Sequence, residues 1–226
     1  MMGASREGLP RVPLADLHHM RVPKVPLDLT DGPAPMTLDD LEVTLGEVSE
    51  LRPRNMMSES PKMRAFSRSG AGDAAELAFE YGGQTDTVSR LASGEVREQV
   101  GLKLRAEDGC NLVYVVWRIH PVPELVVQLK TNPGARTHAE CGVDGYELQK
   151  PAWRTALPDL RPGDRHKLRA ELRGESMTVF VDDRPAWRGS VPGSSQLHGT
   201  VGIRTDNAKI RFELRRLDVD QGDPPG

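Results

Sequence analysis

The sequence predicts an all-β protein, built as an antiparallel β-sandwich or jelly roll. Short stretches of alternating apolar and polar residues follow one another, with turn residues between them at intervals of about ten residues. The run Asn111–Ile119 (NLVYVVWRI) is almost continuously apolar and rich in β-branched residues, as in a central strand covered on both faces. The sequence contains no long pattern of helical period and no solenoid-like repeat.

The chain is expected to consist of an N-terminal arm, one sandwich domain and a short tail. Residues 1–35 contain three Val-Pro pairs and little periodicity, and proline removes backbone donors and disfavours helix before it. This segment is therefore predicted to be an extended Pro-rich arm or linker, which docks on its own domain or on a neighbour. Residues 36–220 form the single domain, and residues 221–226 a disordered tail.

Alternation predicts the strands of the domain and the side chains that point into its core. Leu41–Leu51 begins the series, whereas the Ser-, Arg- and Gly-rich segment 55–73 is expected to be a mobile excursion. The predicted inward-facing sets are Leu77, Phe79 and Tyr81; Val100, Leu102 and Leu104; Val113, Val115, Trp117 and Ile119; Leu125, Val127 and Leu129; Leu168, Ala170 and Leu172; and Met177, Val179 and Val181.

Composition excludes several classes of partner and site. The chain has 226 residues, with 30 basic and 33 acidic ones and a net charge of -3, so no global field favours nucleic acid or a membrane surface. The longest apolar runs are far below the ~20 residues that span a bilayer. Cys110 and Cys141 are too few for a disulfide framework. Two reduced thiols are the default, and a bridge would indicate an oxidising compartment.

The closing part of the chain resembles a known family. Residues His166–Trp187 (HKLRAELRGESMTVFVDDRPAW) give an alternating strand, a glycine turn, a second alternating strand ending in Val-Asp, and a third short run. The later segment GTVGIRTDNAKIRFELRRLDV covers Gly199–Val219. This order resembles the closing strands of concanavalin A-like lectin/glucanase domains, including laminin-G-like modules and the 3-keto-disaccharide hydrolase-like family. His166 stands where those families often have tryptophan, and Asp183 where their turn usually has glycine.

The resemblance implies a concanavalin A-like sandwich, a fold that hosts lectins, glycosidases and plain scaffolds. Glu124–Asn132 (ELVVQLKTN) is also similar to a run in the hydrolase-like family, although that family's Asn-Ser-Gly is replaced here by Asn111-Leu112-Val113. In the turns, Gly174 suits a positive φ, and Asp182 and Asp183 tolerate one.

The middle sheet carries the candidate ligand-binding face. If the odd-numbered residues of Val113–Ile119 point into the core, the even-numbered ones point away from it. The predicted site residues are Tyr114, Arg118, Gln128 and Lys130, with Lys103, Arg105 and His120 beside them. An aromatic ring stacks on a sugar face, while amide and guanidinium groups bind hydroxyls or carboxylates, so the basic character favours a uronic or sulfated sugar. An ordinary solvated sheet face would show the same pattern.

Other chemistries have weaker support in the sequence. Glycoside hydrolysis needs two carboxyls about 5–10 Å apart, and the glucanase run E-x-D-x-x-E is absent, so Glu124 is the carboxylate to test first. No cofactor is predicted, and neither a C-x-x-C pair nor an H-E-x-x-H helix supports zinc at His138–Cys141. The loop oxygens available to a structural calcium ion are those of Asp182, Asp183, Asp206 and Asn207, but their spacing does not select it.

Three functions remain open at this point. The first is a non-catalytic module that binds a carbohydrate or a surface, with an acidic polysaccharide or glycan as its partner. The second is a glycoside-processing hydrolase that resembles the 3-keto-disaccharide family. The third is a structural or assembly module without a sugar ligand. For each we expect a bacterial extracytoplasmic or secreted protein, although the first residues show no apolar signal-peptide core.

Overall fold

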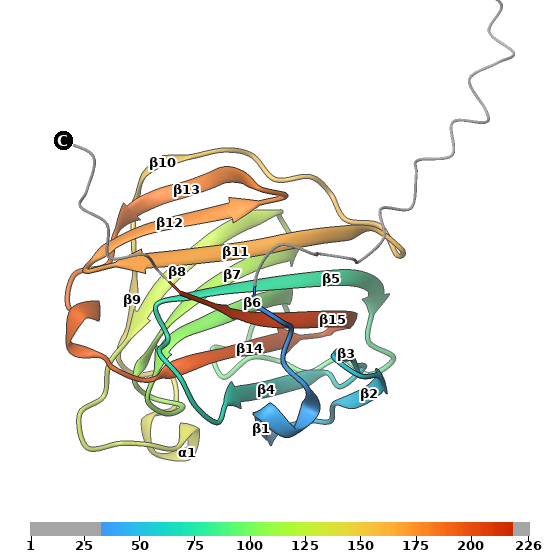
Figure 1. Ribbon diagram of the computed structural model, residues 1–226, viewed down its shortest axis with the longest axis horizontal. Coiled ribbons are helices and arrows are strands. Elements are labelled where there is room, and N and C mark those ends of the chain that lie inside the picture. Colours follow the sequence, from blue (N-terminus) through green and yellow to red (C-terminus); the bar gives the residue numbers. More distant parts are fainter. Residues whose placement is uncertain (1–32, 219–226) are drawn as a thin grey trace, which may run out of the picture. The chain divides into compact units, whose positions relative to one another are not determined.

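The computed structural model describes residues 33–218, which form two antiparallel β-sheets packed face to face as a sandwich (Figure 1). This is the concanavalin A-like fold that the closing strands of the sequence implied. Within residues 33–218, no helix is long and apolar enough to cross a membrane.

The first sheet carries the face of interest below. Its order is β1-β4-β14-β6-β7-β8-β9. These strands are β1 (Leu41–Leu45), β4 (Lys62–Ser67), β14 (Thr200–Asp206), β6 (Glu98–Ala106), β7 (Leu112–His120), β8 (Glu124–Lys130) and β9 (Tyr146–Leu148).

The second sheet has eight described strands in the order β10-β13-β12-β11-β5-β15-β3-β2. They are β10 (Pro151–Arg154), β13 (Arg184–Ser190), β12 (Ser176–Val181), β11 (Arg165–Arg173), β5 (Ala74–Gln84), β15 (Ala208–Leu217), β3 (Asn55–Ser58) and β2 (Ser49–Arg52). The described helices are short, namely η2 (Leu38–Asp40), α1 (His138–Cys141) and η3 (Ser194–Gln196).

The core lies between the two sheets and contains every inward-facing set that alternation predicts. Val113, Val115 and Trp117 of β7 are completely buried. The ring of Trp117 meets the ring of Phe79 on β5 edge to face, with centroids 5.7 Å apart. Because β5 and β7 belong to different sheets, this aromatic pair joins the two layers across the core.

The closing strands pair as their alternation predicts. Leu168 of β11 is opposite Val181 of β12, and the turn that follows places Asp182 and Asp183 at φ values of 50° and 64°. Asp182 accepts a hydrogen bond from the backbone N–H of Lys167 and lies 2.7 Å from Nδ1 of His166. The ring of His166 lies 5.2 Å from that of Trp117, so this histidine contributes to packing between the sheets.

The expectation of a mobile excursion at residues 55–73 is wrong. This segment contains β3 and β4, and Met56, Met63 and Ala65 are completely buried. Lys62–Ser67 alternates between buried and half-buried side chains. Its arginine and lysine face away from the core, so the polar composition of the segment concealed a strand of period two.

The predicted boundaries of the arm and the tail remain predictions. Residues 1–32 and 219–226 lie outside the described residues, and so do most of the predicted arm and all of the predicted tail.

Candidate functional site

A groove with a volume of about 750 Å³ lies on the face of the first sheet that is turned away from the core. Its floor is formed by side chains of β6, β7, β8 and β14, including Tyr114, Val116 and Gln128. One wall consists of residues 91–97, and the other of residues of the 131–145 loop. The volume falls within the range of about 300–1,000 Å³ that is typical of ligand sites.

The lining of the groove is strongly basic. Among its described residues, Glu95 is the one acidic side chain. The basic lining residues are Lys62, Arg64, Arg97, Lys103, Arg118, Arg136 and Arg204. Three carboxylates contact this set, because Glu95 pairs with Arg97, Glu124 with Arg118, and Asp206 with both Arg64 and Arg204. Seven cations therefore face three anions, and the groove carries a local positive charge that the net charge of the chain does not reveal.

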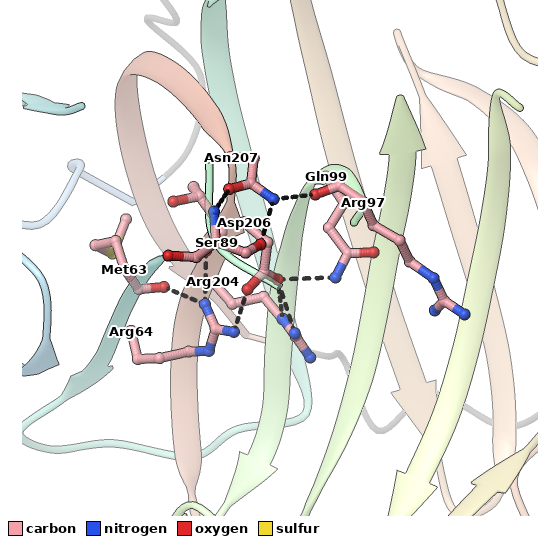
Figure 2. Close-up of polar contacts among 9 residues, drawn as sticks. Met63, Arg64, Ser89, Arg97, Gln99, Arg204, Asp206 and Asn207 are labelled. Atoms are coloured by element: carbon pink, nitrogen blue, oxygen red, sulfur yellow. Dashed lines mark hydrogen bonds and ion pairs between the residues drawn. The ribbon is translucent and has the colours of Figure 1, made fainter. Parts of the chain in front are cut away.

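A buried ion cluster holds the centre of the floor. Asp206, which is completely buried, accepts hydrogen bonds from Arg64 Nη2 at 2.5 Å, Arg204 Nη2 at 2.7 Å and Gln99 Nε2 at 2.8 Å. Figure 2 shows these three side chains converging on one carboxylate from β4, β14 and β6. Arg64 also donates to the carbonyls of Met63 and Thr205. The cluster therefore fixes the two guanidinium groups at the groove floor.

Asn207, the next residue along the chain, fixes the first wall. Its side-chain oxygen accepts the backbone N–H of Ser89, and its Nδ2 donates to the carbonyls of Ser89 and Arg97 (Figure 2). Asn207 has a φ of 55°, a left-handed conformation that asparagine tolerates better than most residues. The turn between β14 and β15 thus ties residues 89–97 to the sheet.

A disulfide between Cys110 and Cys141 fixes the second wall, and the default expectation of two reduced thiols is wrong. The bridge joins the turn before β7 to α1, which the carboxylate of Glu140 caps by accepting the backbone N–H of Thr137. Asn111 adds a further tie, because its Oδ1 accepts the backbone N–H of Asn132 at 2.8 Å.

Three of the four predicted site residues line the groove together, namely Tyr114, Arg118 and Gln128. Tyr114 is only 4% exposed. The guanidinium of Arg204 lies 4.6 Å from its centroid, and the ring of Tyr146 is stacked on it at 5.9 Å. Burial raises the pKa of Tyr114 to about 12, so its hydroxyl stays protonated at neutral pH. Arg118 has a buried Nε that contacts no acceptor in the described part of the chain.

The fourth predicted residue, Lys130, was expected to be exposed and is completely buried. Its Nζ lies 3.0 Å from the Sγ of Cys141 and 3.1 Å from the carbonyl of Gly142, and it also faces the ring of Tyr146. Alternation assigns Lys130 to the same face of β8 as Gln128, but it does not predict that the α1 loop folds over it. Lys130 therefore supports the second wall.

The expectation that Arg105 is exposed is also wrong. This residue has a φ of 44° at the end of β6, so its side chain leaves the strand pattern. It pairs with Asp73 at 2.6 Å and donates to the carbonyls of Gly174 and Ser194. His120 follows the prediction, since its side chain is 62% exposed.

The residues considered for catalysis or metal binding make ion pairs, hydrogen bonds or a disulfide with other protein groups. Glu124, the first carboxylate to test for hydrolysis, pairs with Arg118 and lies 3.8 Å from Arg154. Cys141 is in the disulfide, which removes it from the His138–Cys141 set. Of the loop oxygens considered for calcium, those of Asp206 contact arginines, and Asp182 contacts His166 in a different turn.

Sequence reasoning missed several groove residues. Arg204 is the arginine of the segment GTVGIR. This segment supports the family resemblance, but it gives no sign of a role in ligand binding. Arg64 lies on β4, within the segment whose composition predicts an excursion, and Tyr146 follows a turn. Alternation along Lys62–Ser67 could have found Arg64, whereas no local signal reports that three strands bring their cations to one place.

The cations of the groove act on His138, which lies in its second wall. Burial lowers the pKa of His138, and the positive charges of Lys130, Arg64 and Arg204 lower it further. The positive electrostatic potential that lowers the pKa of His138 is therefore the potential that an anion entering the groove would experience.

No protein-family model and no curated protein matches this sequence. Among solved structures, the carbohydrate-binding module CBM66 from Bacillus subtilis is 15% identical with a TM-score of 0.52, over 82% of this chain and 99% of that one. The Emp46p carbohydrate recognition domain is 11% identical with a TM-score of 0.49, over 80% and 90%. A tetrameric galectin from the sponge Cinachyrella sp. is 12% identical with a TM-score of 0.45, over 70% and 100%. At these identities the similarity shows the fold alone.

Proposed function

We propose that this protein binds an acidic polysaccharide, without cleaving it, in the groove on the first sheet. The observation that carries the proposal is the excess of cations over carboxylates in a groove of ligand size. Guanidinium groups bind carboxylates and sulfate esters in bidentate fashion, and Gln128 offers an amide to sugar hydroxyls. The similarity of the fold to a module named for carbohydrate binding agrees with this proposal.

The geometry favours binding over glycoside hydrolysis. Glu124 is held by Arg118 and Arg154 and is not among the residues that line the groove. The disulfide also supports an extracytoplasmic location, since such bridges persist in oxidising compartments.

The charge of the groove can be tested with two surface substitutions. We expect the wild type to bind polygalacturonate more tightly than dextran, and to bind it less tightly as salt is raised, because salt screens exposed charges. The double variant Lys62→Gln/Arg136→Gln removes two lining cations without touching the buried cluster. Its affinity should fall about three- to tenfold, the effect expected from two partly exposed charge contacts. Isothermal titration calorimetry measures both values.

The matched control is Arg188→Gln/Arg211→Gln. It makes the same change in net charge on two exposed residues of β13 and β15, in the second sheet. Its affinity should equal that of the wild type. An equal loss in both variants would show that net charge alone attracts the polymer, and absence of binding by the wild type would refute the proposed function.

A further inference from the structure

Lys103 occupies an unusual place at the middle of the groove floor. It lies on β6 between Gly202 of β14 and Tyr114 of β7, lines the groove, and is 1% exposed. Gly202 makes room for its stem, because a Cβ at Gly202 would come within 3.2 Å of the Cδ of Lys103. The same Cβ would lie 2.4 Å from the carbonyl oxygen of Ala65. The packing of three strands therefore directs this lysine across the floor.

The ammonium group of Lys103 has no anionic partner. Within residues 33–218, no hydrogen bond or ion pair joins its Nζ to an acceptor, and the Nζ lies over the ring of Phe66, 3.5 Å from the centroid. The other buried lysine, Lys130, has three acceptors around its Nζ. A lysine is rarely buried without a partner, because desolvation of a charge is costly.

The charged groups around Lys103 come from β4 and β14. They are Arg64 of β4 and Arg204 and Asp206 of β14, while the phenol of Tyr114 on β7 is protonated at neutral pH. Burial holds the pKa of Lys103 well below its usual range, and the charges of Arg64 and Arg204 lower it further, against the opposing effect of Asp206. The carboxylate of Asp206 is already shared by two arginines and Gln99. Lys103, Arg64 and Arg204 therefore share a single carboxylate, and Lys103 makes no contact with it.

We propose that Lys103 is the binding site for an oxyanion of the bound sugar, either a carboxylate or a sulfate ester. The inference rests on the proposed function, since it names the residue that receives the acidic group. The oxyanion supplies the missing counter-charge, accepts hydrogen bonds from the protonated Nζ, and favours the charged form of the lysine. No covalent bond forms or breaks.

A pH titration of the lysines, followed by NMR, tests this binding site directly. The protein is labelled with carbon-13 in its lysines, and the resonance that is missing from Lys103→Met identifies Lys103. In sodium chloride its midpoint should lie below those of the other lysines. Galacturonate or inorganic sulfate at millimolar concentration should move the midpoint of Lys103 to higher pH. Because lysine is observed directly, titration of His138 does not interfere.

Each anion reports on one source of the oxyanion. If galacturonate alone moves the midpoint of Lys103, the site binds carboxylates. If sulfate alone moves it, the site binds sulfate esters. A midpoint that neither anion moves overturns the inference, even if the polymer binds elsewhere in the groove. If an anion moves the midpoint but polygalacturonate does not bind, the oxyanion site at Lys103 is supported and the proposed polysaccharide ligand is refuted.

The variant Lys103→Met gives a second readout. Methionine is similar in length and apolar, so the variant should fold and be at least as stable as the wild type, as expected when an unpaired buried charge is removed. Its affinity for the preferred acidic oligosaccharide should fall about tenfold or more, the effect of losing a hydrogen bond to a charged group. Unchanged affinity in a folded Lys103→Met protein would contradict the assignment.

Discussion

Replacing Asp206 with asparagine is expected to lower the free energy of unfolding by about 3–5 kcal/mol. The substitution removes the carboxylate that compensates Arg64 and Arg204, and it places an amide N–H₂ group against one of the two buried guanidinium groups. Such a change should lower the melting temperature of a domain of this size by roughly 10 °C. Thermal and urea unfolding followed by circular dichroism measure the effect.

The control for this substitution is Asp86→Asn. Asp86 pairs with Lys209 at 2.6 Å, but its side chain is 90% exposed, so solvent screens the pair and the unfolding midpoint should not move. An Asp206→Asn protein as stable as the wild type would show that the two arginines do not depend on this carboxylate.

The same carboxylate should govern stability in acid. Burial alone would raise the pKa of Asp206, but Arg204 and Arg64 outweigh burial and lower it to about 2, against 3.8 for an ordinary aspartate. A lowered folded-state pKa contributes stability that is fully present above about pH 4 and is lost as the pH falls towards 2, and it amounts to about 2 kcal/mol. Between these pH values the wild type should lose more stability than Asp206→Asn does.

Removal of the disulfide should have an effect of similar size. The bridge closes a loop with a sequence separation of 31 residues, and loops of this length correspond to about 3–4 kcal/mol of stabilisation through the unfolded chain. The double variant Cys110→Ser/Cys141→Ser should therefore unfold at a lower urea concentration. It should also bind polygalacturonate more weakly, because the bridge holds the groove wall that includes Thr137, His138 and Val143.

Reductant provides the internal control for the bridge. Dithiothreitol should shift the urea midpoint of the wild type towards that of the double variant, and it should leave the double variant itself unchanged. If the two proteins unfold at the same midpoint without reductant, the bridge does not stabilise the second wall.

Local sequence pattern predicts the core of this fold because alternation reports burial directly. Val113, Val115 and Trp117 are buried as expected, and so are Leu168 and Val179. A side chain of a strand must face one layer or the other, so a period of two is sufficient to choose between them.

The site was predictable only in part, because it depends on contacts between segments far apart in the chain. Tyr114, Arg118 and Gln128 line the groove since they share one face of two paired strands. Lys130 lies on the same face, but α1 and its disulfide cover it. Alternation assigns a residue to a face of a sheet, and it does not report what lies over that face.

The placement of a bound oligogalacturonide tests the central claim most directly. Backbone amide shifts of the nitrogen-15-labelled protein can be followed as the oligosaccharide is added. We expect the changes to concentrate at Lys103 and Gln128 on the floor and at residues 91–97 and 136–143 in the walls. Changes concentrated instead on the outer face of the second sheet, at the exposed residues Arg165, Arg173 and Arg211 of β11 and β15, would contradict the assignment of the groove as the binding site.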